Sequence, residues 1–156
     1  MQLIRNVQGY KEKAVLLIKN AEGFRSIPYI DTTGNKTIGY GFNLSNPYFN
    51  DIGSTITETE ADTVLTNYLN LFVYPYVSIP NSSLNDNQFA VIADMIYNLG
   101  IAGFNTFTTF IGYLNSGDIN SAAGDLVGTE WFTQVGLRGI RDVMNLLVEP
   151  EYLYLI

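Results

Sequence analysis

Glu22, Asp31 and Thr37 are the residues in this sequence whose types and spacing best suit acid–base chemistry. Glu22 stands at the expected end of a helix, where the helix dipole disfavours a negative charge, so local stability alone does not explain it. Asp31 opens a cluster of turn residues, and Thr37 begins a short predicted strand. Each residue alone has an ordinary explanation as a solvated carboxylate, a turn aspartate or a strand threonine. Together they join two carboxyl groups and a hydroxyl where a helix ends beside a small sheet.

The composition leaves acid–base work mainly to such carboxylates. The 156 residues include no Cys and no His, which excludes a disulfide scaffold, a thiolate nucleophile, a Ser-His-Asp triad and a zinc site built on imidazole or thiolate ligands. We expect neither a metal nor an organic cofactor. With 15 Asp and Glu against 8 Lys and Arg, the net charge of −7 argues against a nucleic-acid partner.

The predicted elements of the N-terminal part explain how these residues are positioned. Apolar residues recur at helical spacing from Tyr10 to about Glu22, and Gly23 is a suitable helix terminator. Residues 27–44 change character, with a turn cluster between two strand-like runs, and predict a small antiparallel sheet.

The rest of the chain is predicted to be helical. Thr57 and Glu60 form a capping-box signal for a helix that continues to Pro75 and is long enough to link two lobes. Residues 149–156 give no clear prediction. Glycine-containing breaks separate the further predicted helices, which cover residues 85–99, 105–115, 119–127 and 137–148.

The length and the 47% apolar content predict one α+β domain over residues 1–156. Its parts are an N-terminal lobe with the sheet (about 11–56), a linking helix (about 57–75) and a helical lobe (about 81–150). No apolar run approaches the length needed to span a bilayer. Residues 1–8 also lack the apolar region and small-residue cleavage site of a secretory signal.

Three short motifs carry a specific resemblance. Glu22-Gly-Phe-Arg25, Tyr29-Ile-Asp31-Thr-Thr-Gly34 and Thr37-Ile-Gly39-Tyr-Gly41 resemble the phage-type lysozymes of glycoside hydrolase family 24. The resemblance covers roughly residues 15–147. It continues in the helical part through Asn98-Leu-Gly100, Ala102-Gly103-Phe104, Glu130-Trp131-Phe132, Gly136-Leu-Arg138 and Arg141.

The resemblance implies a lysozyme-like α+β fold with two lobes across a cleft, and cleavage of the β-1,4 bond between N-acetylmuramic acid and N-acetylglucosamine. A glycosidic oxygen is a poor leaving group, so one carboxylic acid must protonate it while a second carboxylate directs a water. In that scheme Glu22 is the acid, Asp31 directs the water and Thr37 holds the same water. The mechanism is then inverting, and we expect the two carboxyl groups to lie about 6.5–9.5 Å apart.

The resemblance also implies the substrate-binding residues. Arg138 matches a basic residue that pairs with the catalytic glutamate from the opposite lobe. Gly41 leaves room for a sugar ring near the backbone, Phe42 offers an aromatic face for stacking, and Asn98 is polar at the cleft end of an otherwise apolar helix. Phe42 is also a departure, because family members commonly have His there, which puts stability in question rather than mechanism.

Two alternatives remain open at this level. One is a catalytically weak or silent module that binds peptidoglycan or a partner on a lysozyme fold, for which the acidic charge and Phe42 give slight support. The other is a lytic transglycosylase, which works with one acidic residue and needs no carboxylate to direct water. Asp31 argues against the second alternative.

The expected partner is the glycan strand of peptidoglycan, bound by a monomer. The lack of a signal peptide fits an endolysin that waits in the host cytoplasm before release to the cell wall, or a protein exported by a non-classical route.

Overall fold

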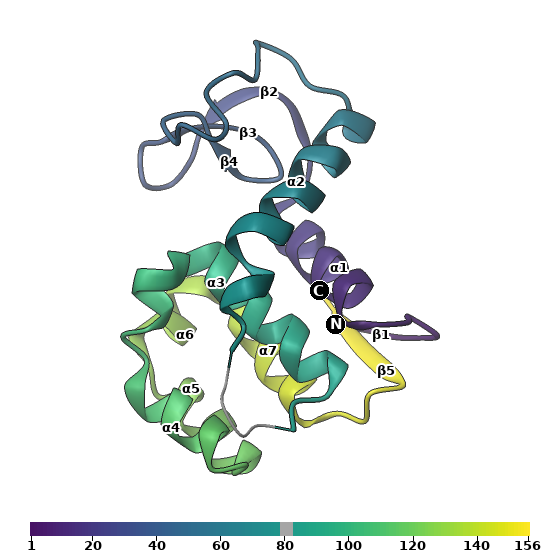
Figure 1. Cartoon of the computed structure of the whole chain (residues 1–156), viewed down its shortest axis with the longest axis vertical. Helices are drawn as coiled ribbons and strands as arrows, with labels where there is room; N and C mark the ends of the chain where they lie inside the picture. The colour runs from purple at the N-terminus through teal and green to yellow at the C-terminus, as the bar shows by residue number, and fades with distance from the viewer. Residues whose placement is uncertain (79–82) are drawn as a thin grey trace.

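The computed structural model describes residues 1–78 and 83–156 and shows an α+β fold in two lobes (Figure 1). The first lobe holds a small antiparallel sheet of strand order β2-β3-β4. The second lobe is helical, and helix α2 (Glu58–Phe72) runs from one lobe to the other. The predicted α+β, lysozyme-like class is confirmed. The predicted start of the helical lobe, near residue 81, lies outside the described residues.

The sheet consists of β2 (Arg25–Ile30), β3 (Lys36–Gly39) and β4 (Phe42–Asn43). All neighbours are antiparallel, and Thr37 of β3 lies opposite Tyr29 on one side and Asn43 on the other. The tight turn between β3 and β4 needs glycine, because Gly39 and Gly41 have φ angles of 67° and 78°. The sheet covers residues 25–43 and thus begins before the predicted stretch 27–44.

Two helices bracket the sheet in the chain. Helix α1 (Tyr10–Glu22) ends as predicted at Gly23, which has a φ angle of 67°. Helix α2 begins at the predicted capping box, in which Thr57 and Glu60 exchange hydrogen bonds between side chain and backbone. It ends at Phe72, three residues before Pro75, which lies in the short 3-10 helix η1 (Tyr74–Tyr76).

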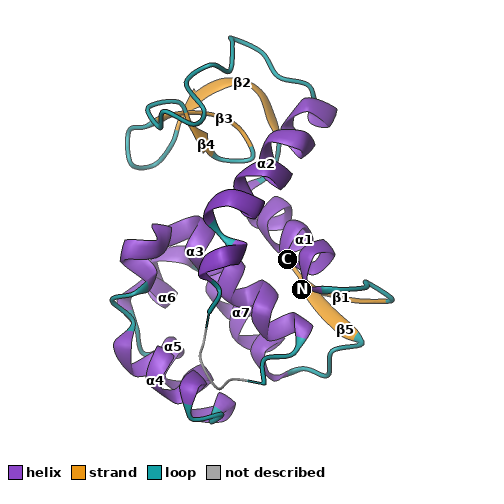
Figure 2. Ribbon diagram, viewed as in Figure 1, coloured by secondary structure: helices purple, strands orange, loops and turns teal. Residues whose placement is uncertain are grey.

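The helical lobe contains α3 (Asp86–Phe104), α4 (Thr108–Asn115), α5 (Ile119–Val127), α6 (Glu130–Val135) and α7 (Leu137–Leu147). Helix α3 is interrupted at Gly100, whose φ of 73° and ψ of 160° are non-helical, so the predicted break is present and a short helical stretch follows it to Phe104. The short α6 was not predicted. Figure 2 shows that helices make up nearly all of this lobe, and the described helices include none long and apolar enough to cross a membrane.

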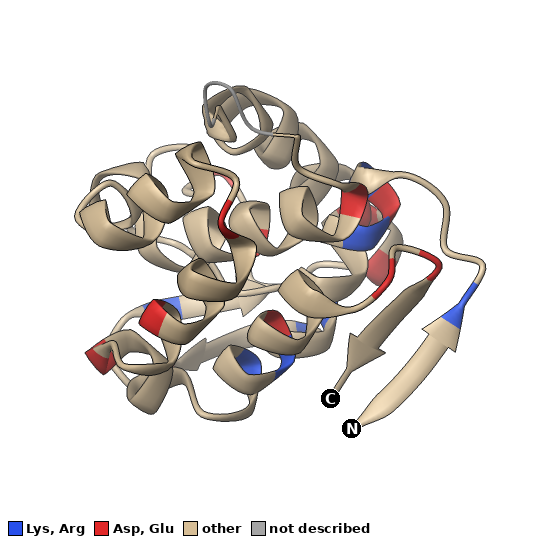
Figure 3. Cartoon of the chain, turned by 90° about the horizontal axis from the view of Figure 1, so that it is seen from below, with Lys and Arg blue, Asp and Glu red and all other residues tan. Residues whose placement is uncertain are grey.

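A second, two-stranded sheet joins the ends of the chain. Strands β1 (Gln2–Arg5) and β5 (Tyr152–Leu155) pair antiparallel. No element was predicted for the C-terminal residues 149–156. Asn145 of α7 secures β5 by bonding both the N–H and the carbonyl of Tyr154. Large parts of the ribbon carry no charged residue (Figure 3).

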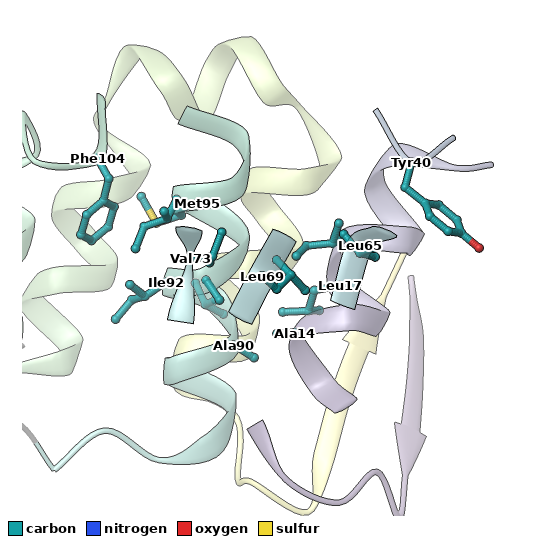
Figure 4. Close-up of a cluster of buried hydrophobic side chains, with 14 of the residues drawn as sticks. Ala14, Leu17, Tyr40, Leu65, Leu69, Val73, Ala90, Ile92, Met95 and Phe104 are labelled. Carbon is teal, nitrogen blue, oxygen red and sulfur yellow. The ribbon is translucent and has the colours of Figure 1, made fainter. Parts of the chain in front are cut away.

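The core surrounds α3, whose residues from Ala90 to Ile96 are all buried. Most of them are apolar, and Figure 4 shows Ile92 and Met95 among side chains from α1 and α2, including Leu17, Leu65 and Leu69. Such close packing makes α3 the rigid support for the elements on either side of it. Asp94 is the charged residue in this buried stretch.

Candidate active site

A cavity of about 440 Å³ is lined by residues of both lobes. Glu22 comes from the end of α1, and Asp31 from the turn between β2 and β3. Asn98 of α3 and Arg138 of α7 line it from the helical lobe. Four residues that lie far apart in the sequence thus share one cavity, and two of them are carboxylic acids.

Glu22 is held from two directions. Its Oε2 accepts a hydrogen bond of 2.7 Å from Nη1 of Arg138, whose side chain is 9% exposed. On the other side lies Gly41, where a Cβ would be 2.9 Å from the carboxyl carbon of Glu22. Gly41 lines the cavity as expected, but the space that its missing side chain leaves is filled by the Glu22 carboxyl group. That a sugar ring approaches the backbone at Gly41 stays a prediction.

Asp31 has one oxygen committed to its own turn. Oδ1 accepts hydrogen bonds from the backbone N–H of Asn35 at 2.8 Å and from the hydroxyl and backbone N–H of Thr33 at 2.8 and 2.9 Å. These hydrogen bonds hold the pKa of Asp31 below its usual value, and the bond from the backbone of Asn35 has the largest effect. Among the described residues, no hydrogen bond is made to Oδ2, so an ionised oxygen is left for a water molecule.

Thr37 lies next to this cavity without lining it. Its side chain is buried, and its hydroxyl donates to the carbonyl of Asn35 at 3.0 Å. Asn35 and the cross-strand partner Asn43 are both lining residues. The sequence therefore placed Thr37 in the correct neighbourhood, one layer behind the wall.

Phe42 does not reach the cavity, which corrects its prediction as a substrate-binding residue. The side chain is fully buried and stacks on Phe49, with ring centroids 4.8 Å apart and planes at 15°. A Cβ at Gly39 would lie 2.6 Å from the same ring. Phe42 thus fills the core of the sheet lobe.

Asn98 is oriented by a neighbour on α6. Its Oδ1 accepts a hydrogen bond of 2.8 Å from Nε1 of Trp131, which leaves the amide N–H groups as donors on the exposed side. The adjacent Tyr97 also lines the cavity, and its hydroxyl donates to the carbonyl of Tyr40 at 2.6 Å. Helix α3 thus supplies an amide donor and an aromatic ring at this wall.

Sequence reasoning missed three amide side chains that line the cavity: Asn35, Asn43 and Asn46. Sugars are recognised through hydroxyl groups, which both donate and accept hydrogen bonds, as amides do. The available signal was the clustering of these asparagines at strand ends, which resembles ordinary turn composition. Only the fold shows that they share a wall with Glu22 and Asp31.

Comparisons with known proteins identify the family to which the chain belongs. A family model described as phage lysozyme matches residues 19–145. An endolysin of Acyrthosiphon pisum secondary endosymbiont phage 1 is 29% identical over 119 residues, which cover 74% of this chain and 76% of that protein. An endolysin of Bacillus phage PZA is 29% identical over 118 residues, covering 73% of this chain and 43% of that longer protein. The chain therefore belongs to the phage lysozyme family.

Proposed function

We propose that this protein is a muramidase that hydrolyses the β-1,4 bond between N-acetylmuramic acid and N-acetylglucosamine in peptidoglycan, with inversion at the anomeric carbon. Membership of the phage lysozyme family supports a peptidoglycan-hydrolysing glycoside hydrolase. The observation that carries the finer proposal is that Glu22 and Asp31, with different electrostatic surroundings, line the same cavity.

Glu22 is the proposed general acid. In its protonated form it gives a proton to the glycosidic oxygen, and a carboxylate forms as the bond breaks. The Nη1 group of Arg138, at 2.7 Å from Oε2, stabilises that developing charge more than it stabilises the neutral acid. Stabilisation that grows toward the transition state accelerates the reaction.

Asp31 is the proposed base that directs the attacking water. Its lowered pKa keeps it ionised, and its Oδ2 is the oxygen that can accept a hydrogen from water. Thr37 does not line the cavity, and its hydroxyl donates to the carbonyl of Asn35; its proposed part in holding the same water is therefore to fix Asn35 in the wall beside Asp31. We propose a separation of about 6.5–9.5 Å between the two reacting carboxyl groups, because the water must fit on the far face of the sugar.

The experiment that tests this function compares wild type with Glu22→Gln on purified peptidoglycan sacculi. We expect wild type to reduce turbidity and Glu22→Gln to be at least about 10²-fold slower, since an amide cannot supply the proton. Mass spectrometry of the fragments should show hydrated reducing ends. Anhydro ends would indicate a lytic transglycosylase, and binding to sacculi without cleavage would indicate a silent module.

Stereochemistry tests the mechanism separately. We expect proton NMR during cleavage of a soluble glycan to show the α-anomer as the first product, because water attacks opposite the leaving group. The β-anomer as first product would instead require a covalent intermediate on Asp31.

The two endolysin relatives support a role in lysis. We propose that the protein acts on the cell wall after release from the host cytoplasm, as a monomer on peptidoglycan strands.

A further inference from the structure

A buried cluster of charged side chains lies behind the cavity, and the mechanism above does not use most of it. Asp94 of α3 is fully buried. Its Oδ2 and Oδ1 accept hydrogen bonds from Nε and Nη2 of Arg138 at 3.0 and 2.8 Å. The remaining edge of the same guanidinium, through Nη1, faces Glu22 at 2.7 Å. Arg138 is thus held side-on by one carboxylate while it contacts the other.

We propose that Asp94 is a positioning residue for the general acid Glu22, an inference that rests on the function proposed above. Asp94 fixes the guanidinium so that one N–H edge is directed at Glu22. Its negative charge also offsets part of the positive charge that Arg138 presents to Glu22.

The electrostatic part follows from the short distances. A positive charge at hydrogen-bond distance lowers a carboxyl pKa by roughly 1–3 units, which would leave an acid catalyst largely ionised at neutral pH. Burial opposes ionisation of Asp94, but the charge and hydrogen bonds of Arg138 outweigh it and hold the pKa of Asp94 below the usual range. Asp94 therefore remains an anion while Glu22 gains and loses its proton.

The second arginine of the cluster ties this arrangement to α1. Arg141 is fully buried and donates through Nη2 to Asp94 at 3.0 Å and to Asp142 at 2.8 Å. Its Nη1 donates to the carbonyl of Leu17, on the helix that ends at Glu22, at 2.7 Å. The helices that carry Asp94, Arg138 and Glu22 are thus joined by one network.

Asp142 differs from Asp94 in its contacts. Its Oδ2 is buried and has no hydrogen-bond partner among the described residues. Burial, together with the nearby Asp94 carboxylate, raises the pKa of Asp142 well above its usual value. Of the two buried carboxyl groups, Asp94 is thus the one whose contacts with Arg138 and Arg141 favour the ionised form.

The other titratable groups near Glu22 do not duplicate this role. Burial raises the pKa of both Tyr97 of α3 and Tyr29 of β2. Both side chains are therefore uncharged at neutral pH. Asp31 is an anion on the same cavity but makes no contact with Arg138. Removal of the charge on Asp94 should therefore act on Glu22 through Arg138, which is hydrogen-bonded to both carboxyl groups.

The test is Asp94→Asn, which keeps the shape of the side chain and removes its charge. We expect ¹³C NMR titration to show that the pKa of Glu22 falls by about one unit. The alkaline limb of the pH–rate profile on sacculi should move to lower pH by the same amount, since the protonated acid is lost as the pH rises through a lower pKa. An unchanged or raised Glu22 pKa in the folded variant would overturn the proposal.

Asp142→Asn is the matched control, because Asp142 is equally buried and binds the same Arg141 but makes no hydrogen bond to Arg138 among the described residues. We expect it to leave the Glu22 pKa in place; an equal fall in both variants would mean a general disturbance and would overturn the proposal. If Asp94→Asn does not fold, Asp94→Asn/Arg141→Gln keeps the net charge of the cluster and the contact of Arg138 with Glu22; a smaller fall in the same direction is expected, because Arg141 lies farther from Glu22 than Arg138 does, and no fall would overturn the proposal. The NMR titration needs no turnover, so an inactive wild type would refute the proposed function while the Asp94 result stands by itself.

Discussion

Glu22 owes its position to what surrounds it rather than to its own helix. A carboxylate at the C-terminal end of α1 opposes the helix dipole, and the hydrogen bond from Arg138 at 2.7 Å compensates locally. Gly41 leaves the space in which the carboxyl group lies. At the scale of single residues, the acid is thus placed by a cation on one side and by the absence of a side chain on the other.

Gly41→Ala tests this placement. The substitution is strained at a φ of 78°, and its Cβ would lie 2.9 Å from the carboxyl carbon of Glu22. We expect a loss of stability of about 1 kcal/mol or more and a fall in activity of roughly 10²-fold, because a small displacement of a catalytic group is costly. Thermal unfolding and turbidity assays measure the two effects.

Gly117→Ala is the control for strain alone. Gly117 has a similar φ of 75°, and a Cβ there would have nothing within 4 Å. We expect comparable destabilisation with unchanged activity. If both variants lost activity equally, strain rather than contact with Glu22 would be the cause.

At the scale of elements, the short strands of the sheet lobe depend on aromatic packing. Phe42 stacks on Phe49, and Phe49 contacts Tyr68 of α2 with ring centroids 5.0 Å apart. Tyr68 in turn meets Tyr97 of α3 edge to face, at 5.8 Å. This line of rings connects the strand that follows Gly41 to the helix that carries Asn98. A small sheet with few backbone hydrogen bonds gains its rigidity from such contacts.

Phe42→Ala should therefore destabilise the protein strongly. We expect a loss of about 3–5 kcal/mol, typical for removal of a buried aromatic side chain. Phe72→Ala is the comparison, because Phe72 is 42% exposed and should cost about 1 kcal/mol. Denaturant unfolding of both variants measures the difference, and similar losses would contradict a central role for Phe42.

At the scale of the whole molecule, the net charge of −7 affects encounter with the substrate. Bacterial cell walls are anionic, so the long-range field of the protein repels them at low ionic strength. Salt shortens the Debye length from about 30 Å at 0.01 M to about 8 Å at 0.15 M. The charged residues of the active site act over much shorter distances and are affected less.

We therefore expect activity on whole cell walls to rise as salt increases from about 0.01 M to 0.15 M. Short soluble glycans carry fewer charges and should show a weaker dependence. Turbidity rates across a salt series measure the effect. A steady decline from the lowest salt concentration would show instead that attraction at a local positive site controls binding.

Much of this fold was predictable because its signals are local. The end of α1 at Gly23, the capping box of Thr57 and Glu60, and the turn that Asp31 opens each depend on a few neighbouring residues. The pairing of β1 with β5 joins the two ends of the chain, and no local pattern marks such a contact. The same holds for the contact between Asp94 and Arg138, which joins α3 to α7.

The sequence by itself determined most of the helices, the sheet lobe, the family motifs and the candidate pair of carboxylic acids, since residue type and spacing carry that information. Only the tertiary structure decided which side chains meet. It turned Phe42 inward, set Thr37 one layer behind the wall, and filled the space at Gly41 with Glu22. It also placed Asp94 against Arg138. These outcomes depend on how packed elements share volume and charge, which the sequence pattern of any single element does not contain.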